Sequence, residues 1–267
     1  MRTIGATMPG VEPVELLEIA VDAARAAGAR LLDRFGTGAD GVGSKSSATD
    51  MVSDADREAE ALIRARIRDA RPHDAILGEE RGEEPGTSGL RWVVDPLDGT
   101  TNYLFGIPQW CVSIACEDAD GGIIGVVNDP VRDEIFTGIR GRRAYRNGRW
   151  MSVSAKDDLS DALIATGFSY QEEERAAAAL ILERVLPRVR DIRRAGSAAL
   201  DLAWTAAGLF DGYYESPTHH WDWAAGVVLV RAAGGVVTDM PALGPSGPGK
   251  VASGSPLHDA LRALVIG

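Results

Sequence analysis

From about residue 154 onward, strand-like apolar runs alternate with helical segments, and this alternation constrains the fold more than any other feature of the chain. Strands that alternate with helices are typical of an α/β unit. The runs are ALIATGF, DIRRAG, GLFDGYYES, GGVVTDM and KVASGS, and helices are expected over 172–186, from Ser197, from Trp221 and after KVASGS. The pattern predicts an α/β second half.

The first half has a different pattern. The spacing of its apolar residues predicts a helix over 13–35, and a second helix is expected to begin near Ser53, with Asp56 as its capping-box partner. Short strand-like runs then dominate up to about Ser154, and the pair Asn147-Gly148 is typical of a hairpin turn. We therefore expect a more antiparallel α+β half in this part of the chain.

The two patterns divide the chain near residue 150. We expect a loose N-terminal tail over 1–12, an α+β half over 13–150 and an α/β half over 151–267. A chain of 267 residues is long enough to bury a core as one large domain or as two closely joined halves.

Charge and hydropathy exclude two classes of partner. The 39 acidic residues outnumber the 28 basic ones and give a net charge of −11, whereas nucleic-acid binding needs lysine and arginine. An anionic substrate would need bound cations nearby, because the overall field of the protein repels it. No apolar run reaches the about 20 residues of a membrane helix, and the start lacks the apolar core of a signal peptide, so a cytoplasmic protein is expected.

Cys111 and Cys116 are the only cysteines, and both lie in the apolar run WCVSIACED. Five positions apart on a strand, they would face opposite sides of a sheet about 16 Å apart, which is too far for a disulfide. Both are therefore predicted to be core residues.

The stretch WVVDPLDGTTNYLFG, over 92–106, places two aspartates where an apolar strand ends. Because proline fixes its own φ and the chain turns there, Asp95 and Asp98 can converge around the carbonyl of Leu97. Glu79 ends another apolar strand, in AILGEERG. Carboxylates and a backbone carbonyl are the hard oxygen ligands that Mg²⁺ prefers.

A phosphate site is expected beside this metal. If a helix begins after Asp98, the amides of Gly99, Thr100 and Thr101 point toward one place, which suits a phosphate oxygen. A metal and a phosphate together indicate phosphoryl chemistry. On this stretch alone, an equally good explanation is that Asp95 and Asp98 only make turn and cap hydrogen bonds, since Asp, Pro and Gly are the usual turn residues.

Three separated motifs carry a resemblance to a known family. In this order, GEE, WVVDPLDGTTNYLFGIP and HWDWAAGVVLVRAAGGVV resemble the magnesium-dependent, lithium-sensitive inositol monophosphatase family. The resemblance extends to KSSATDMVSDAD and RRAGSAALDLAWTAAGLFDGYYE and covers nearly all of the chain beyond the tail. It implies a fold of mixed α+β and α/β class, a layered αβαβα sandwich of the sugar-phosphatase type.

The resemblance also implies a set of site residues. Two or three Mg²⁺ ions would be held by Glu79, Asp95, the carbonyl of Leu97, Asp98 and Asp222. Glu79 and Thr100 would lie beside the attacking water, Asp56 would stand behind Thr100, and Lys45 matches a family lysine near the metals. The substrate would contact Asp98, Gly99, Thr100, Thr101, Ala198, Glu215 and Asp222.

Two of these residues also have structural explanations. Asp56 is fully explained as a helix-capping residue, and Asp222 as a first-turn acid that the helix dipole favours. A carboxylate at a helix start can also point at a metal, so for Asp222 the two explanations are compatible.

The implied activity is Mg²⁺-dependent hydrolysis of a phosphate monoester of a polyol, in first place myo-inositol 1-phosphate, by two-metal in-line attack of water. The segment ESPTHHWD departs from the common glycine-containing version and leaves the polyol open. Histidinol phosphate, a sugar bisphosphate and a nucleotide 3′-phosphate are the alternative substrates. A regulatory binding protein on the same fold is the alternative from another class. By resemblance, we expect a lithium-sensitive homodimer.

Overall fold

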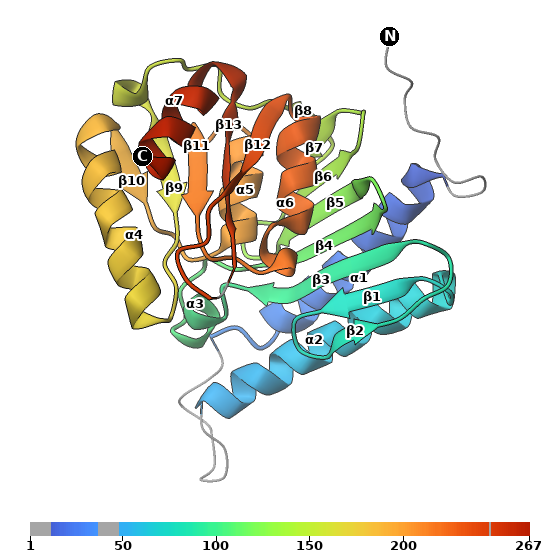
Figure 1. Ribbon diagram of the computed structural model, residues 1–267. Helices are drawn as coiled ribbons and strands as arrows, with labels where there is room; N and C mark the ends of the chain where they lie inside the picture. The colour runs from blue at the N-terminus through green and yellow to red at the C-terminus, as the bar shows by residue number, and fades with distance from the viewer. Residues whose placement is uncertain (1–11, 37–47, 246) are drawn as a thin grey trace.

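Two β-sheets and the helices around them form five layers (Figure 1). The computed structural model describes residues 12–36, 48–245 and 247–267, with only the backbone of residues 48–53. The outer face of the first sheet is covered by α1 (Pro13–Leu32) and α2 (Ala48–Ala70). Between the two sheets lie α5 (Ala198–Ala206) and α6 (His220–Ala232). The outer face of the second sheet is covered by α4 (Glu172–Val185) and α7 (Ser255–Ile266). The predicted layered αβαβα fold is confirmed.

The first sheet has eight strands in the order β2-β1-β3-β4-β5-β6-β7-β8. Only β1 and β3 pair in parallel, and every other neighbouring pair is antiparallel. The strands are β1 (Ala75–Gly78), β2 (Gly82–Glu84), β3 (Arg91–Asp98), β4 (Cys111–Asp118), β5 (Gly121–Asp129), β6 (Glu134–Ile139), β7 (Ala144–Arg146) and β8 (Arg149–Met151). The short helix α3 (Thr100–Leu104) follows β3 directly.

The second sheet has five strands in the order β10-β9-β11-β13-β12. The strands β10, β9 and β11 are parallel, while β13 pairs antiparallel with β11 and β12. Their bounds are β9 (Leu163–Thr166), β10 (Asp191–Arg193), β11 (Gly212–Glu215), β12 (Gly235–Met240) and β13 (Gly249–Gly254). The parallel part corresponds to the alternation of strands and helices in the sequence.

Three apolar clusters fill the spaces between the layers. One lies between α1, α2 and the first sheet, the second packs α5 and α6 between the sheets, and the third lies under α4 and α7. The central strands β3, β4 and β5 are buried on both faces, because helices cover both sides of the first sheet. Their sequences are therefore continuous apolar runs instead of alternating ones.

The start of the second helix differs from the sequence prediction. A start near Ser53 was expected, but α2 begins at Ala48, so Asp56 lies inside the helix and is not its capping residue. The signal failed because a Ser-x-x-Asp pattern also occurs within helices, and the residues before it continue the helix. Asp56 is buried, which the capping explanation does not account for.

The local signals for the hairpin and the cysteines were correct. Asn147 and Gly148 have φ of 48° and 73° and join β7 to β8. Cys111 and Cys116 are free and buried on β4, where Cys111 belongs to the cluster between the sheets and Cys116 to the cluster under α1 and α2. The two thiols therefore face opposite sides of the sheet, as predicted.

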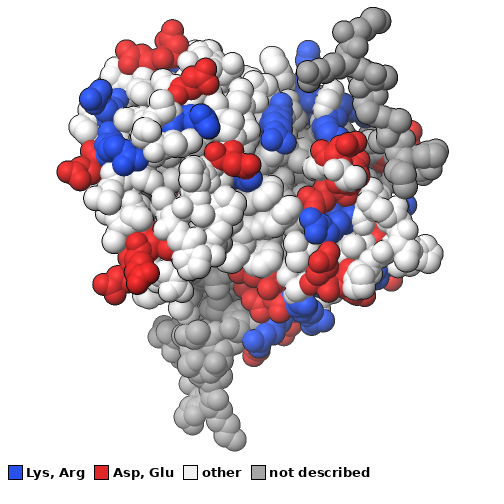
Figure 2. Space-filling model, viewed as in Figure 1, with Lys and Arg blue, Asp and Glu red and all other residues white. Residues whose placement is uncertain are grey.

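Charged side chains of both signs are interspersed on the face shown in Figure 2. Ion pairs lie near the edge of the first sheet, such as Arg68 with Glu84 at 2.6 Å and Arg91 with Glu83 at 3.5 Å. Such exposed pairs contribute little to stability. Within the described residues, no helix is both long and apolar enough to cross a membrane.

Asp211 ties the segment between the sheets to the second sheet. Its carboxylate accepts hydrogen bonds from Ser154 Oγ at 2.5 Å, Lys156 Nζ at 2.9 Å and Leu163 N at 2.7 Å, and the side chain is nearly inaccessible. The segment that leaves β8 is thus fastened at the entrance of β9.

We expect Asp211→Ala to lower the free energy of unfolding by about 1–3 kcal/mol, because it removes the buried acceptor of three hydrogen bonds. Asp157→Ala, an exposed aspartate in the same segment, is the matched control and should change it by less than about 0.5 kcal/mol. Urea unfolding of both variants measures the difference. Equal stability of the two variants would contradict the fastening role.

Candidate active site

One cavity of about 550 Å³ is lined by elements of both sheets. Every described residue that the sequence assigns to the site lines it: Asp56, Glu79, Asp95, Leu97, Asp98, Gly99, Thr100, Thr101, Ala198, Glu215 and Asp222. Lys45 lies outside the described residues. The first eight lie in α2, directly after β1, and from β3 into α3, and the last three lie in α5, β11 and α6, so the cavity is shared by both parts of the chain.

The end of β3 forms an irregular turn at the cavity. The pairing of β3 with β4 shifts register between Asp95 and Asp98. Asp95 Oδ1 accepts from Leu97 N at 3.1 Å, and Thr100 Oγ1 donates to Leu97 O at 2.9 Å. Gly99 has a φ of 97°, a left-handed conformation that glycine adopts without strain, and it starts α3. Asp95 therefore makes the turn hydrogen bond that its sequence position suggests, and it also lines the cavity. The hydroxyl of Thr100 points to Leu97 O and not to Asp56.

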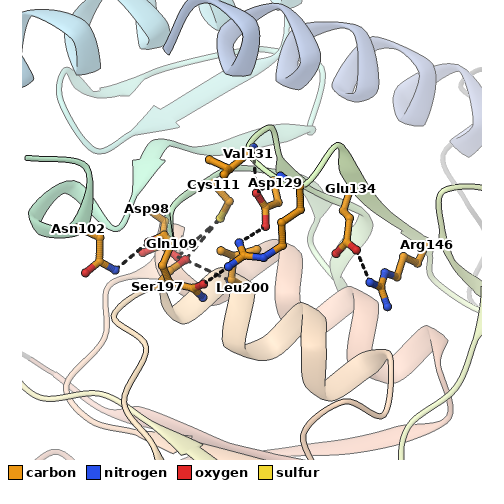
Figure 3. A network of polar contacts seen from close by, with 11 residues as sticks. Asp98, Asn102, Gln109, Cys111, Asp129, Val131, Glu134, Arg146, Ser197 and Leu200 are labelled. Carbon is orange, nitrogen blue, oxygen red and sulfur yellow. Dashed lines mark hydrogen bonds and ion pairs between the residues drawn. The ribbon is translucent and has the colours of Figure 1, made fainter. Parts of the chain in front are cut away.

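Asp98 is bound from the opposite part of the chain (Figure 3). Its Oδ2 accepts from Ser197 Oγ at 2.6 Å and from Ala199 N at 2.7 Å, and Cys111 Sγ lies 3.9 Å away. Ser197 is the N-cap of α5, so Asp98 binds the start of that helix. The cap explanation is also correct for Asp98, but the helix that it caps is in the second part of the chain.

Asp222 lies in the first turn of α6, where its Oδ2 accepts from His219 N at 2.7 Å. This is the helix-start role that its sequence position suggests. The same side chain lines the cavity, close enough to Asp98 for the two charges to interact. Its helix-start position and its approach to Asp98 occur together.

The acids of the cavity hold their protons more tightly than free acids. Burial raises the pKa of Asp56 to about 8 and that of Glu79 to about 7. Burial and the neighbouring carboxylates raise the pKa of Asp95 and Asp222 well above the ordinary value, and burial raises the pKa of Asp98. Negative charge is therefore crowded here, and a bound cation would relieve the crowding.

Glu215 stands at the second-sheet side of the cavity, at the end of β11. Burial raises its pKa to about 7, and Tyr213 donates its hydroxyl hydrogen to Glu215 Oε2 at 3.1 Å. A carboxylate with one oxygen held in this way has lone pairs left to accept from a hydroxyl group of a ligand.

The donor set suits Mg²⁺, although the side chains are not gathered around a metal position. Among the described residues, no three His, Cys, Asp or Glu side chains stand close enough together to hold an ion as they are. Glu79 and Asp95 instead interact with each other, and this interaction partly offsets the rise that burial causes in the pKa of Glu79. Four of the lining carboxylates, those of Glu79, Asp95, Asp98 and Asp222, are nonetheless hard oxygen donors of the kind found in magnesium sites, as is the Leu97 carbonyl, and none of these proposed donors is a histidine or a thiolate.

Several lining residues were not singled out from the sequence. Phe168 and Tyr170 follow β9, and Tyr170 is 79% exposed while its hydroxyl lies 2.9 Å from Thr101 Oγ1. Arg194 also lines the cavity, with its guanidinium 6.0 Å from the ring of Phe168. The segments TGFSYQ and RRAG carry no local signal for this position, because only the fold brings them to the turn of Gly99, Thr100 and Thr101.

The five layers, with an acid-lined cavity at the junction of the two sheets, define a class of phosphatase fold, and comparison with known proteins gives the family. The model of the inositol monophosphatase family matches residues 12–262. The chain belongs to this family, and a phosphatase of this family is what the fold and sequence support.

Individual relatives cover nearly the whole chain. The inositol-1-monophosphatase of Rhizobium meliloti is 44% identical over 94% of this chain and 96% of its own. A protein of Escherichia coli named Nus factor SuhB is 42% identical over 84% of this chain and 85% of its own. The solved structure of the inositol monophosphatase from Anabaena superposes with a TM-score of 0.81 at 36% identity, over 94% of this chain and 95% of that one.

The raised pKa values predict how stability depends on pH without metal. An acid with a raised pKa in the folded state stabilises the fold at low pH, and that stabilisation is lost as the pH rises through the folded pKa. For Asp56, Glu79 and Glu215, this loss runs from the ordinary pKa values of 3.8 and 4.5 up to the folded values of about 7 to 8, where it is complete. Burial lowers the pKa of His258, so its contribution to stability rises with pH, but only below its ordinary pKa of 6.5.

We therefore expect the free energy of unfolding in chelator to fall by at least about 1 kcal/mol between pH 6.5 and pH 8. Urea titrations at several pH values in this interval measure the slope, and Glu215→Gln should reduce it. A stability that is flat or rises with pH would show that these acids are ionised in the folded protein at neutral pH.

Proposed function

We propose that the protein is a Mg²⁺-dependent phosphomonoesterase that hydrolyses a phosphate ester of a polyol, with myo-inositol 1-phosphate as the first substrate to test. One observation carries the proposal: acids from both parts of the chain gather around one cavity next to the turn of Gly99, Thr100 and Thr101, with Asp56 and Asp95 buried and Asp98, Glu215 and Asp222 half-buried. So many neighbouring carboxylates with little access to water are unfavourable unless a cation is bound among them.

In this proposal, Mg²⁺ is held by Glu79, Asp95, the Leu97 carbonyl, Asp98 and Asp222, with two or three ions per site. Bound there, the metal lowers the pKa of a water molecule and offsets the charge of the leaving alkoxide.

The side chains have separate tasks in the reaction. Glu79 is the general base that accepts a proton from the attacking water. Thr100 orients the attacking water through its hydroxyl, and Asp56 supports this part of the site from α2. The amides of Gly99, Thr100 and Thr101 receive the phosphate.

The polyol is recognised on the other side of the cavity. Glu215 accepts a hydrogen bond from a ring hydroxyl, and Ala198, at the start of α5, lies alongside the ring. The inositol-1-monophosphatase relative from Rhizobium meliloti supports this substrate. Histidinol phosphate, a sugar bisphosphate and a nucleotide 3′-phosphate remain alternatives, because ESPTHHWD departs from the common family segment.

A phosphate-release assay with these four esters, with and without Mg²⁺, tests the activity. We expect turnover only with Mg²⁺, the highest kcat/KM for the inositol ester, and inhibition by millimolar Li⁺. Full turnover in excess chelator would refute the metal mechanism, and a higher kcat/KM for another ester would replace the substrate.

A binding protein on the same fold is the second candidate, and the relative named Nus factor SuhB favours keeping it. The two candidates differ in one measurable property, since a binding protein needs no turnover. Absence of phosphate release from all four esters in saturating Mg²⁺ would favour this candidate.

We also propose a homodimer. Phe105 and Ile107, which follow α3, are 73% and 48% exposed, and large apolar side chains at neighbouring positions are typical of surface that a partner covers. Light scattering at micromolar concentration gives the mass; a monomer mass would refute the dimer.

Asp222→Asn tests whether both parts of the chain hold the same metal. The amide oxygen can still accept from His219 N, but a full negative charge is lost from the proposed metal site. We expect turnover to fall by roughly 10²-fold or more because the metal binds poorly, while the metal-free melting temperature stays level or rises as repulsion is relieved.

Glu172→Gln is the matched control for Asp222→Asn, because Glu172 is an exposed first-turn acid of α4 outside the cavity lining. It should keep normal turnover and lose at most about 1 kcal/mol of stability. If Asp222→Asn behaved in the same way, Asp222 would be a structural helix-start acid only.

A further inference from the structure

A buried ion pair lies on α2 beneath the turn between β1 and β2. The side chain of Glu60 is 0% exposed and that of Arg64 is 9% exposed, and neither belongs to the site residues that the sequence indicates. A buried ion pair seldom stabilises a fold more than apolar residues of the same size would. Stability therefore does not explain why this ion pair lies beside the cavity, and another role is expected.

Both oxygens of Glu60 are occupied by defined donors. Arg64 Nε donates to Glu60 Oε1 at 2.7 Å, and the backbone N–H of Glu80 donates to Glu60 Oε2 at 2.7 Å. Arg64 Nη2 also donates to the carbonyl of Gly82 at 2.6 Å. The pair thus holds the turn at two places, one directly after Glu79 and one at the start of β2.

The carboxylate of Glu60 also lies against the residue before Glu79. A Cβ atom at Gly78 would stand 2.6 to 2.7 Å from the carboxyl atoms of Glu60, which is closer than side chains approach. Only glycine leaves room for Glu60 here. Glu60 therefore fixes the backbone on both sides of Glu79, at Gly78 and at Glu80.

We propose that Glu60, held by Arg64, is a positioning residue that sets the orientation of Glu79 in the candidate metal site. Glu60 does not line the cavity and acts through the backbone on either side of Glu79. The inference rests on the proposed function, since it requires that Glu79 binds Mg²⁺. It adds a residue that determines metal affinity without contacting the metal.

The test is calorimetric titration of the purified protein with Mg²⁺ alone, without substrate, together with the melting temperature in chelator. In Glu60→Gln, the amide must turn its NH₂ group toward either Arg64 Nε or Glu80 N, so one of the two hydrogen bonds is lost. We expect the Kd for Mg²⁺ to rise about 10-fold, as is typical when a residue that orients a metal ligand is replaced.

The matched control is Glu58→Gln. Glu58 is on the same helix and is also paired with arginine, but its partners Arg30 and Arg34 are at the surface. The change in net charge is the same, so the control accounts for an effect of overall charge on Mg²⁺ binding. Glu60 also acts on Glu79 directly through its charge, and the variant Gly78→Ala, which keeps that charge, separates this effect from positioning. We expect the control to keep the Kd of the unmodified protein.

Two further variants keep the test decisive if Glu60→Gln fails to fold. Gly78→Ala pushes the Glu60 carboxylate away, and Arg64→Met removes its second support, so each should weaken Mg²⁺ binding in the same direction. Unchanged Mg²⁺ affinity in the folded variants, even with a lowered melting temperature, would show that the pair is only structural and overturn the proposal. If the unmodified protein itself bound no Mg²⁺, the proposed function would fail and this inference with it, which the titration of that protein shows first.

Discussion

The hydrogen bonds of Asp98 connect the first sheet to the helix layer between the sheets at the point where the cavity lies. Asp98 ends β3, yet its carboxylate accepts from Ser197 and Ala199, which start α5. A carboxylate that binds the N-terminal N–H groups of a helix makes strong hydrogen bonds, because the helix end is positively polarised. The relative positions of the β3 turn and of Ala198 in the cavity follow from this contact.

This connection is made with groups that oppose folding on their own. Asp95 is buried, Asp98 and Asp222 are half-buried, and burial raises the pKa of each. The apolar clusters above and below the first sheet supply the stability that such an arrangement requires. The protein is thus built as a stable layered frame around a locally unfavourable site, the arrangement expected where a site must bind a cation.

The periodicity of apolar residues was sufficient to predict the order of the helices and of most strands along the chain. Long apolar runs such as those of β3 to β5 fit a buried strand better than any other structure. The periodicity missed β2, whose three residues are Gly-Glu-Glu and contain no apolar pattern, and which pairs with β1 where Arg64 binds Gly82. The acids of the cavity were recognisable from their motifs. The contact between Asp98 and Ser197 was not, because 99 positions separate them and only the packed fold brings them together.

The position of Cys111 beside Asp98 determines how the site responds to oxidants. Cys111 Sγ lies beside Asp98 and Ser197, where burial raises its pKa well above the ordinary value. Oxidants and alkylating reagents react with an accessible thiolate. Cys111 is buried, and its raised pKa keeps it in the thiol form, so it meets neither condition. The site can therefore contain a sulfur atom next to a candidate metal ligand and still keep its chemistry independent of the redox state around the protein.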